Sequence, residues 1–354
     1  MRRLIGLLTG IALFGTAQGE WIHFDAQKEE LRPKFTLLAF TDSGGRFEVE
    51  LSGIEFSSAV LDGKRWDRVE IPGGGFEQEI GKPEVPHITR LFAIPADVGV
   101  RVEVAVLSER VLKNVELMPA QGIAPDEGED AGRVRHYDAS CFGANRFYPE
   151  MRAVLGEPAI LRDLRVIPVQ VNPVQYNPVT TELRIAQRME VILRFEGRDL
   201  RNAQTRAPRR FSPTWAKIAI ADVVNFEEAG DVDEDLIGSY LVICANDPTL
   251  VNVINTYLLD WKRCKGHTAV VQTFSPGSSA TTIKNMIQTA YDTWETPPEF
   301  VLLFGDNDGD YALPGWDYYV GDHPYSQLAG NDILADVAVG RIPAGNLTEA
   351  LAMI

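Results

Sequence analysis

The hydrophobic pattern of this chain changes once, near residue 238. In residues 35–196, apolar and polar side chains alternate between glycine and proline turns, which is typical of half-buried antiparallel strands. Residues 240–245 are instead a continuous apolar run, as in a parallel strand buried on both faces. The pattern predicts a β-rich antiparallel, sandwich-like part followed by an α/β part with a parallel sheet.

The second part reads as alternating strands and helices. Apolar residues recur at helical spacing in residues 250–265 and again from Ser278 or Ser279 to Tyr291, between the apolar runs 240–245, 268–273 and 300–304. This order predicts a doubly wound parallel sheet with right-handed crossovers. Ligands bind such sheets at the carboxyl ends of the strands, where we expect Asp247 and Asp306. Asn346 and Glu349 predict the capped start of another helix.

The same patterns divide the chain into four segments. Residues 1–19 carry two arginines, an apolar run and small residues, which predicts a cleaved secretory signal because the run is shorter than the roughly 20 residues of a membrane span. Residues 20–200 form the β-rich part, 201–237 a linker, and 238–354 the α/β part. The linker is basic in 201–217 and acidic in 227–235, typical of solvated chain. Its Arg209–Arg210 pair predicts an exposed processing junction.

Composition excludes several classes of function. A formal net charge of −16 disfavours nucleic-acid binding, which needs clustered cations. Three cysteines are too few for a disulfide scaffold, and no later segment is long and apolar enough to span a membrane. Residues 245–248 read Ala-Asn-Asp-Pro, a carboxylate where a phosphate-binding loop needs glycines, so we expect no nucleotide.

An acidic run follows the third apolar strand. Asp306, Asp308 and Asp310 alternate in Asp-Asn-Asp-Gly-Asp, and Asp317 stands twelfth from the first. The glycine is fourth instead of sixth, which disfavours an EF-hand. Oxygen ligands in a flexible loop nevertheless suit calcium better than zinc or copper. The alternative is a solvated turn.

The cysteines and histidines present do not suggest a catalytic pair. Cys244 lies inside the first buried strand, where thiols are usually inert, and His267 opens the neighbouring strand at its opposite end. Cys264 ends a helix and so lacks the helix N-terminus that would lower its pKa. His323 lies in an acidic loop, but no cysteine follows it. We therefore assign no catalytic residue within this chain.

The order of several short motifs resembles the precursors of gingipain-type cysteine peptidases, a secreted bacterial family with a caspase-like catalytic domain. Gly-Lys-Pro-Glu-Val-Pro at 81–86 and Tyr-Asn-Pro-Val-Thr at 176–180 are similar to the propeptide. Val-Leu-Leu-Phe-Gly-Asp at 301–306, Gly-Asn-Asp at 330–332 and Val-Gly-Arg-Ile-Pro at 339–343 are similar to the first part of the catalytic domain.

The resemblance implies a fold, an activity and a location. It implies a propeptide that contacts and inhibits a caspase-like sheet, here truncated, and a full-length enzyme that cleaves peptide or protein substrates by thiolate attack with a histidine base. The family's histidine and cysteine motifs do not occur here, so the fragment itself is expected to be inactive. We expect a secreted or cell-surface bacterial protein.

The resemblance also implies roles for acidic residues of the α/β part. Asp306, Asp322 and Asp332 would line or brace the active-site end, some of them through a structural calcium ion. The full set of predicted metal ligands is Asp306, Asp308, Asp310, Asp322 and Asp332.

Two other functions stay open at this point. The chain could be a non-catalytic secreted or surface module that binds a partner or glycan, with a degenerate α/β unit. It could also belong to a transpeptidase of the same fold that processes other secreted proteins.

Overall fold

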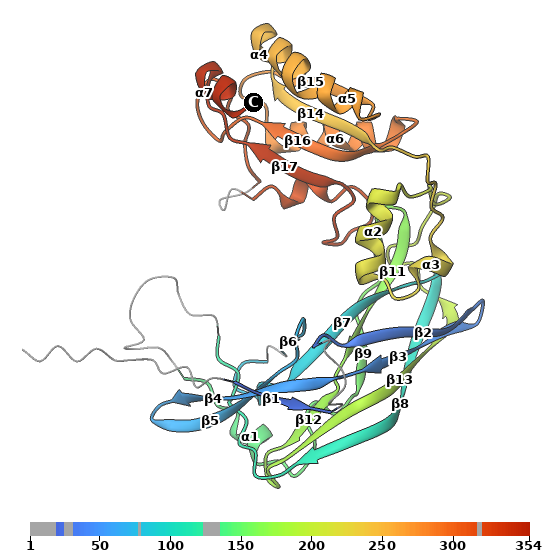
Figure 1. The fold of residues 1–354 in the computed structure, drawn as a ribbon, viewed down its shortest axis with the longest axis vertical. Coiled ribbons are helices and arrows are strands. Elements are labelled where there is room, and N and C mark those ends of the chain that lie inside the picture. The colour runs from blue at the N-terminus through green and yellow to red at the C-terminus, as the bar shows by residue number, and fades with distance from the viewer. Residues whose placement is uncertain (1–18, 25–30, 77–78, 123–134, 317–320) are drawn as a thin grey trace, which may run out of the picture.

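A computed structural model describes residues 19–24, 31–76, 79–122, 135–316 and 321–354. The predicted signal segment, apart from its last residue, and Asp317 lie outside the described residues. The described chain forms a β-rich N-terminal part and an α/β C-terminal part, joined through two short helices (Figure 1). Among the described residues, no helix is long and apolar enough to cross a membrane.

The N-terminal part is built from antiparallel strands in three sheets. Their orders are β1-β4-β5, then β10-β11-β7-β6 with β9 beside β11, and β12-β13-β3-β2 with β8 beside β13. The strands are β1 (Glu20–His23), β2 (Lys34–Thr41), β3 (Gly44–Glu50), β4 (Gly53–Leu61), β5 (Lys64–Glu70), β6 (Gly75–Phe76), β7 (Pro86–Ala93), β8 (Val98–Leu112), β9 (Ala153–Leu155), β10 (Ala159–Leu161), β11 (Leu164–Val171), β12 (Val174–Asn177) and β13 (Glu182–Arg198).

Alternating side chains of these strands face one another to form the N-terminal core. Phe47 of β3 and Phe92 of β7 are fully buried, and their rings stack with centroids 6.0 Å apart. A short helix, α1 (Ala139–Phe142), begins where the Asp138 carboxylate accepts hydrogen bonds from two backbone N–H groups. The predicted antiparallel, period-two architecture is confirmed.

Helices α2 (Pro213–Asp222) and α3 (Phe226–Ala229) pack on the N-terminal sheets. Phe211, Trp215 and Phe226 are buried in one cluster with residues of β7, β10 and β11. The Ser212 hydroxyl caps α2 by accepting a hydrogen bond from the Trp215 N–H. The middle of the predicted solvated linker is therefore folded, because its apolar residues cover the open end of the sheet.

The α/β part contains a four-stranded, fully parallel sheet in the order β15-β14-β16-β17. The chain crosses the sheet in one direction from β14 to β15 and in the other from β15 to β16, and crossovers of the same hand then place the helices before and after β15 on opposite faces. The elements are β14 (Ser239–Ala245), α4 (Pro248–Val253), a π-helical segment η1 (Ile254–Leu259), α5 (Asp260–Cys264), β15 (Ala269–Phe274), α6 (Ala280–Thr293), β16 (Pro298–Phe304), a 3₁₀ turn η2 (His323–Ser326), β17 (Ala338–Ile342) and α7 (Leu347–Met353).

The predicted strands and helices of this part are confirmed, with one difference. The helix predicted over 250–265 is interrupted by the π-helical turn η1. The capping pair is present, since Asn346 Oδ1 accepts from the Glu349 N–H at 3.1 Å and Glu349 Oε2 accepts from the Gly345 N–H at 2.7 Å.

Candidate functional site

The carboxyl end of β14 carries Asp247, as predicted. Its Oδ1 accepts hydrogen bonds from the N–H groups of Thr249 at 2.7 Å and Leu250 at 3.0 Å, so it caps α4. These backbone donors, the Leu250 N–H first, lower the pKa of Asp247. Its Oδ2 accepts from the Tyr311 hydroxyl at 3.2 Å. Asp247 therefore ties the loop after β16 to the end of β14.

The acidic run after β16 forms a turn at the same edge of the sheet. Asp306 Oδ1 accepts from the N–H of the next residue at 2.8 Å, and the Asp306 carbonyl accepts from the Leu313 N–H at 2.6 Å. Asp308 and Asp310 are exposed. The carboxylates of this run therefore close a local turn and face solvent.

Asp322 is held by an arginine for which the sequence predicts no role. Arg341 of β17 donates from Nε to Asp322 Oδ2 at 2.8 Å and from Nη2 to Oδ1 at 2.7 Å. The remaining nitrogen, Nη1, donates to the carbonyls of Gly305 at 2.7 Å and Leu313 at 2.8 Å. Such bidentate pairing fixes geometry as well as charge. Arg341 thus fastens two loops to the end of the sheet.

Asp332 lies at the contact between the two parts of the chain. Its Oδ2 accepts from the Ile160 N–H at 2.8 Å and from Asn202 Nδ2 at 3.3 Å, while Oδ1 accepts from the Leu334 N–H at 2.9 Å. Two of these donors belong to the N-terminal part. A signal for this role is not visible in the sequence, because the donors are 130 and 172 residues away.

The five predicted metal ligands do not come together as one calcium site. Asp322 is paired with the guanidinium of Arg341, and Asp332 accepts from N–H donors of two other segments. Among the residues that the structure describes, no group of three or more His, Cys, Asp or Glu side chains is placed to hold a metal ion. Calcium binding by any of these five residues stays a prediction.

The thiols in this chain are poor nucleophiles or lie away from the sheet's carboxyl edge. Burial, with Asp247 adding to it, raises the pKa of the Cys244 thiol to about 12. Burial also raises the pKa of the Cys141 thiol. Cys264 is exposed at the end of α5. All three are free. His267 Nδ1 lies 2.6 Å from the Gly238 carbonyl oxygen, at the amino end of the sheet.

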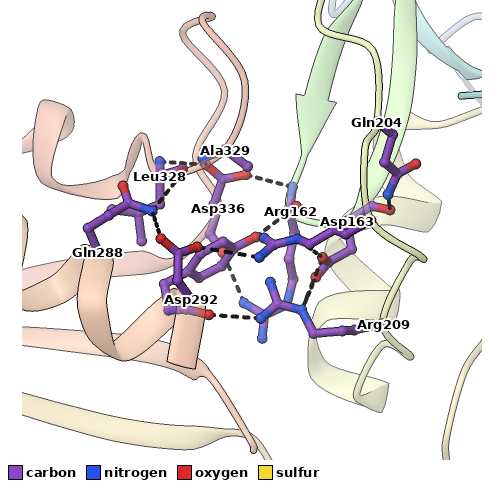
Figure 2. A network of polar contacts seen from close by, with 11 residues as sticks. Arg162, Asp163, Gln204, Arg209, Gln288, Asp292, Leu328, Ala329 and Asp336 are labelled. Atoms are coloured by element: carbon purple, nitrogen blue, oxygen red, sulfur yellow. Dashed lines mark hydrogen bonds and ion pairs between the residues drawn. The ribbon is translucent and has the colours of Figure 1, made fainter. Parts of the chain in front are cut away.

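A polar network joins the β10–β11 turn to the α/β part (Figure 2). Arg162, in this turn, adopts a left-handed backbone conformation with φ of 57°. Its N–H donates to Asp336 Oδ1 at 2.8 Å. Its guanidinium Nη1 donates to the carbonyls of Asp336 at 2.9 Å and Pro298 at 3.2 Å. A single turn residue therefore binds the other part through both its backbone and its side chain.

Asp336, which accepts the hydrogen bond from this turn, is fully buried and lies just before β17. Its Oδ2 accepts from the N–H groups of Leu328 and Ala329, both at 2.7 Å. Burial raises the pKa of Asp336 to about 7, although the three N–H donors favour its ionised form. The carboxylate organises the 328–336 loop and the docked turn together.

Two further residues of α6 and β16 complete the contact. The Tyr291 hydroxyl donates to the Arg162 carbonyl at 2.7 Å. Burial raises the pKa of Tyr291. Glu299, also buried, lies 3.7 Å from Arg162 Nη2. Burial raises its pKa, opposed by the Ser212 hydroxyl and by Arg162.

Arg209 extends the network from the segment predicted to be an exposed junction. Its Nε lies 2.9 Å from Asp163 Oδ2, and its Nη1 donates to the Tyr291 carbonyl at 2.9 Å. Its guanidinium carbon lies 4.4 Å from the centre of the Tyr291 ring, in reach of a cation–π interaction. Arg209 is therefore an interface residue, and the prediction of an exposed Arg209–Arg210 pair is wrong for its first member.

Comparisons with known proteins agree with this two-part organisation. A family model described as Propeptide_C25 matches residues 26–232, and one described as Peptidase family C25 matches residues 234–354. Gingipain R2 of Porphyromonas gingivalis is 24% identical over 349 residues, covering 96% of this chain and 46% of that protein. Lys-gingipain of the same species is 27% identical over 329 residues, covering 87% of this chain and 18% of that protein.

A solved structure described as a complex of the RgpB pro- and mature domains from P. gingivalis is 24% identical, with a TM-score of 0.47, and covers 55% of this chain and 99% of that chain. This chain spans less than half the length of the gingipains named above. On the family matches, which together cover most of its residues, the chain belongs to the gingipain-type C25 cysteine peptidase family, as a precursor with its propeptide before its peptidase segment.

Proposed function

We propose that the full-length protein is a secreted cysteine-type endopeptidase of a bacterium, made as a precursor whose N-terminal part is an inhibitory propeptide. The catalytic cysteine would attack the peptide carbonyl as a thiolate, and a histidine would pass the proton to the leaving amine. Both catalytic residues would lie in sequence outside residues 1–354. Peptides or proteins are the proposed substrates.

The observation that carries this proposal is the docking of the N-terminal part on the α/β part. Arg162, Asp332 and Asp336 make direct backbone and side-chain bonds across the contact, so the two parts are built to associate. A binding module with a degenerate α/β unit would not require such a buried polar contact. The family membership supplies the chemistry.

The cysteines of this chain support the second half of the proposal, that residues 1–354 alone do not cleave peptides. Cys244 is buried within β14, and a nucleophile needs an accessible thiolate. Cys141 and Cys264 lie in α1 and α5, away from the predicted site at the carboxyl edge of the sheet, whereas Cys244, near the carboxyl end of β14, is fully buried.

The test compares the 354-residue chain with the full-length precursor on unfolded protein substrates. We expect cleavage by the full-length protein after removal of the propeptide, its loss after alkylation with iodoacetamide, and no cleavage by the 354-residue chain. Cys244→Ala in the full-length protein is the matched control and should retain activity. Full-length activity that survives alkylation, or activity of the short chain that Cys244→Ala abolishes, would contradict the proposal.

A further inference from the structure

The basic segment that follows β13 is fastened to the N-terminal part. The buried guanidinium of Arg165 donates five hydrogen bonds to backbone carbonyls, at 2.8 to 3.1 Å. Three of these acceptors, the carbonyls of Asp199, Arg201 and Asn202, belong to this segment. Peptidases cut preferentially at exposed loop tips, whose backbone they can bind. Residues 199–202 therefore do not offer a cleavage site in the folded protein.

The Arg209–Arg210 bond is protected in a second way. Arg209 is bound to Asp163 and Tyr291, and the next residue but one, Phe211, is buried. The Phe211 N–H donates to the Asp231 carbonyl at 2.8 Å, and the Asp233 N–H donates to the Phe211 carbonyl at 3.0 Å. The chain is therefore held before this bond by the side chain of Arg209 and after it by the backbone hydrogen bonds of Phe211.

A cut at that bond would also divide a folded unit. Asn225, between α2 and α3, accepts from the Ala93 N–H at 2.7 Å and donates to the Ala93 carbonyl at 3.0 Å. Asn225 is fully buried, and the Val224 N–H donates to the Leu91 carbonyl at 2.9 Å. Residues 211–226 therefore belong to the N-terminal fold, and the chain leaves this fold only after the Phe211 pairing ends at Asp233.

The segment between this pairing and the first strand of the α/β part is an exposed turn, in which the Leu236 N–H donates to the Asp233 carbonyl at 3.1 Å. Residues 205–208 are also exposed, but a cut there would separate α2 and α3 from the N-terminal fold to which they belong. Glu234, Asp235 and Ile237 are exposed, and β14 begins at Ser239. The two family models also meet here, at residues 232 and 234. Between Lys217 and Lys262 the sequence contains no lysine or arginine. The accessible junction therefore lacks any basic residue.

We propose that the precursor is cut after Glu234 or Asp235, by a peptidase that accepts an acidic residue on the amino side of the scissile bond. The inference rests on the proposed function, in which the N-terminal part is removed as a propeptide. Water adds across the peptide bond, which leaves a new carboxylate on Glu234 or Asp235 and a new ammonium group on the residue that follows. Helices α2 and α3 depart with the N-terminal part.

The first test is the N-terminal sequence of the mature protein formed from the full-length precursor in its producing cell. We expect the mature chain to begin at Asp235 or Leu236. A mature chain that begins at Arg210 or Phe211, or a precursor that stays uncut, overturns the inference. Iodoacetamide-sensitive peptide cleavage, measured on the same sample, reports on the proposed function separately, so the two can fail independently.

The second test uses paired variants of the full-length precursor. Glu234→Gln with Asp235→Asn should slow conversion at least about tenfold, because a pocket that pairs a carboxylate discriminates against its neutral isostere. Glu227→Gln with Glu228→Gln removes the same charge from the neighbouring helix α3 and should leave the rate unchanged, as should Arg210→Gln. Equal rates for both acidic double variants, or slowing by Arg210→Gln, would overturn the acidic site.

Discussion

The backbone N–H of Arg162 donates to Oδ1 of Asp336 at 2.8 Å, between residues 174 positions apart in the sequence. Because Asp336 also accepts from two N–H groups of its own loop, it is the acceptor that both parts of the chain share. Its contacts make it the most informative residue at which to perturb the docking of the two parts.

Replacing Asp336 with asparagine should destabilise the chain by about 2 kcal/mol. An asparagine places an NH₂ donor against an N–H donor on one side, and a buried donor without an acceptor costs the full desolvation penalty. Urea unfolding followed by tryptophan fluorescence measures the change. Asp308→Asn, in an exposed position, is the control and should lie within about 0.5 kcal/mol of the parent. Equal midpoints for the two variants would contradict the role of Asp336.

Stability should fall as the pH rises from about 4 to about 7. The pKa of Asp336 is raised to about 7 in the folded chain from an ordinary value of 3.8, so the folded state holds a proton that the unfolded state has lost over this window. Asp336 favours the folded state most below about pH 4, and its effect on the free energy of unfolding no longer changes above about pH 7. Glu299, whose pKa is also raised, acts in the same direction.

The urea midpoint at pH 5 and at pH 7.5 measures this dependence. The parent chain should lose more stability between these values than Asp336→Asn, which cannot titrate. The same pH dependence in both chains would exclude Asp336 as its source.

Arg162→Ala should cost about 3 kcal/mol, since it leaves the buried Glu299 without its cation. Combining it with Glu299→Gln should recover part of the loss, because the double variant buries no unpaired charge. A double-mutant cycle by urea unfolding gives the coupling energy between the two residues. Strictly additive effects would show that the 3.7 Å contact contributes nothing.

Arg341→Lys should loosen the loops after β16 while leaving the sheet folded. A lysine keeps the charge but cannot make the bidentate pair with Asp322 together with the two carbonyl contacts. Hydrogen exchange of the Leu313 amide, whose acceptor is Asp306, should speed up, whereas amides in the centre of β14 should not. Unchanged exchange at Leu313 would contradict this role.

One thiol of the native chain should react with Ellman's reagent, and the other two only after unfolding. Cys264 is exposed, whereas Cys141 and Cys244 are buried and have raised pKa values. Cys264→Ser should remove the native reaction, and Cys244→Ala should leave it unchanged. Reaction of two thiols in the native chain would show that a buried strand opens.

The sequence predicted the features that local patterns determine. The continuous apolar run of β14 and the Asn346–Glu349 pair both lie within a few residues of the structure they specify. The β10–β11 turn was missed because its Arg162–Asp163 pair looks like an ordinary exposed turn. Its partners, Asp336 and Arg209, come from distant segments, and no local pattern encodes them.

The same limit explains the error at Arg209. A basic pair in a polar segment is typical of solvated chain. Arg209 is instead held by the Asp163 carboxylate and by the carbonyl and ring of Tyr291, 46 and 82 residues away. Asp332 was expected at the edge of an acidic site, but its carboxylate accepts hydrogen bonds from Ile160 and Asn202. Charged residues that bind across two folded units are predictable only once both units are placed.

The exposed stretch between Asp233 and Ser239 has a consequence for how firmly the two parts hold together. While this stretch is intact, it keeps the β10–β11 turn close to the 328–336 loop and so gives the two parts a high effective concentration relative to each other. Once it is severed, the same bonds hold a bimolecular complex, whose occupancy falls on dilution. Secretion into a large volume would then favour separation without any change in the contact itself.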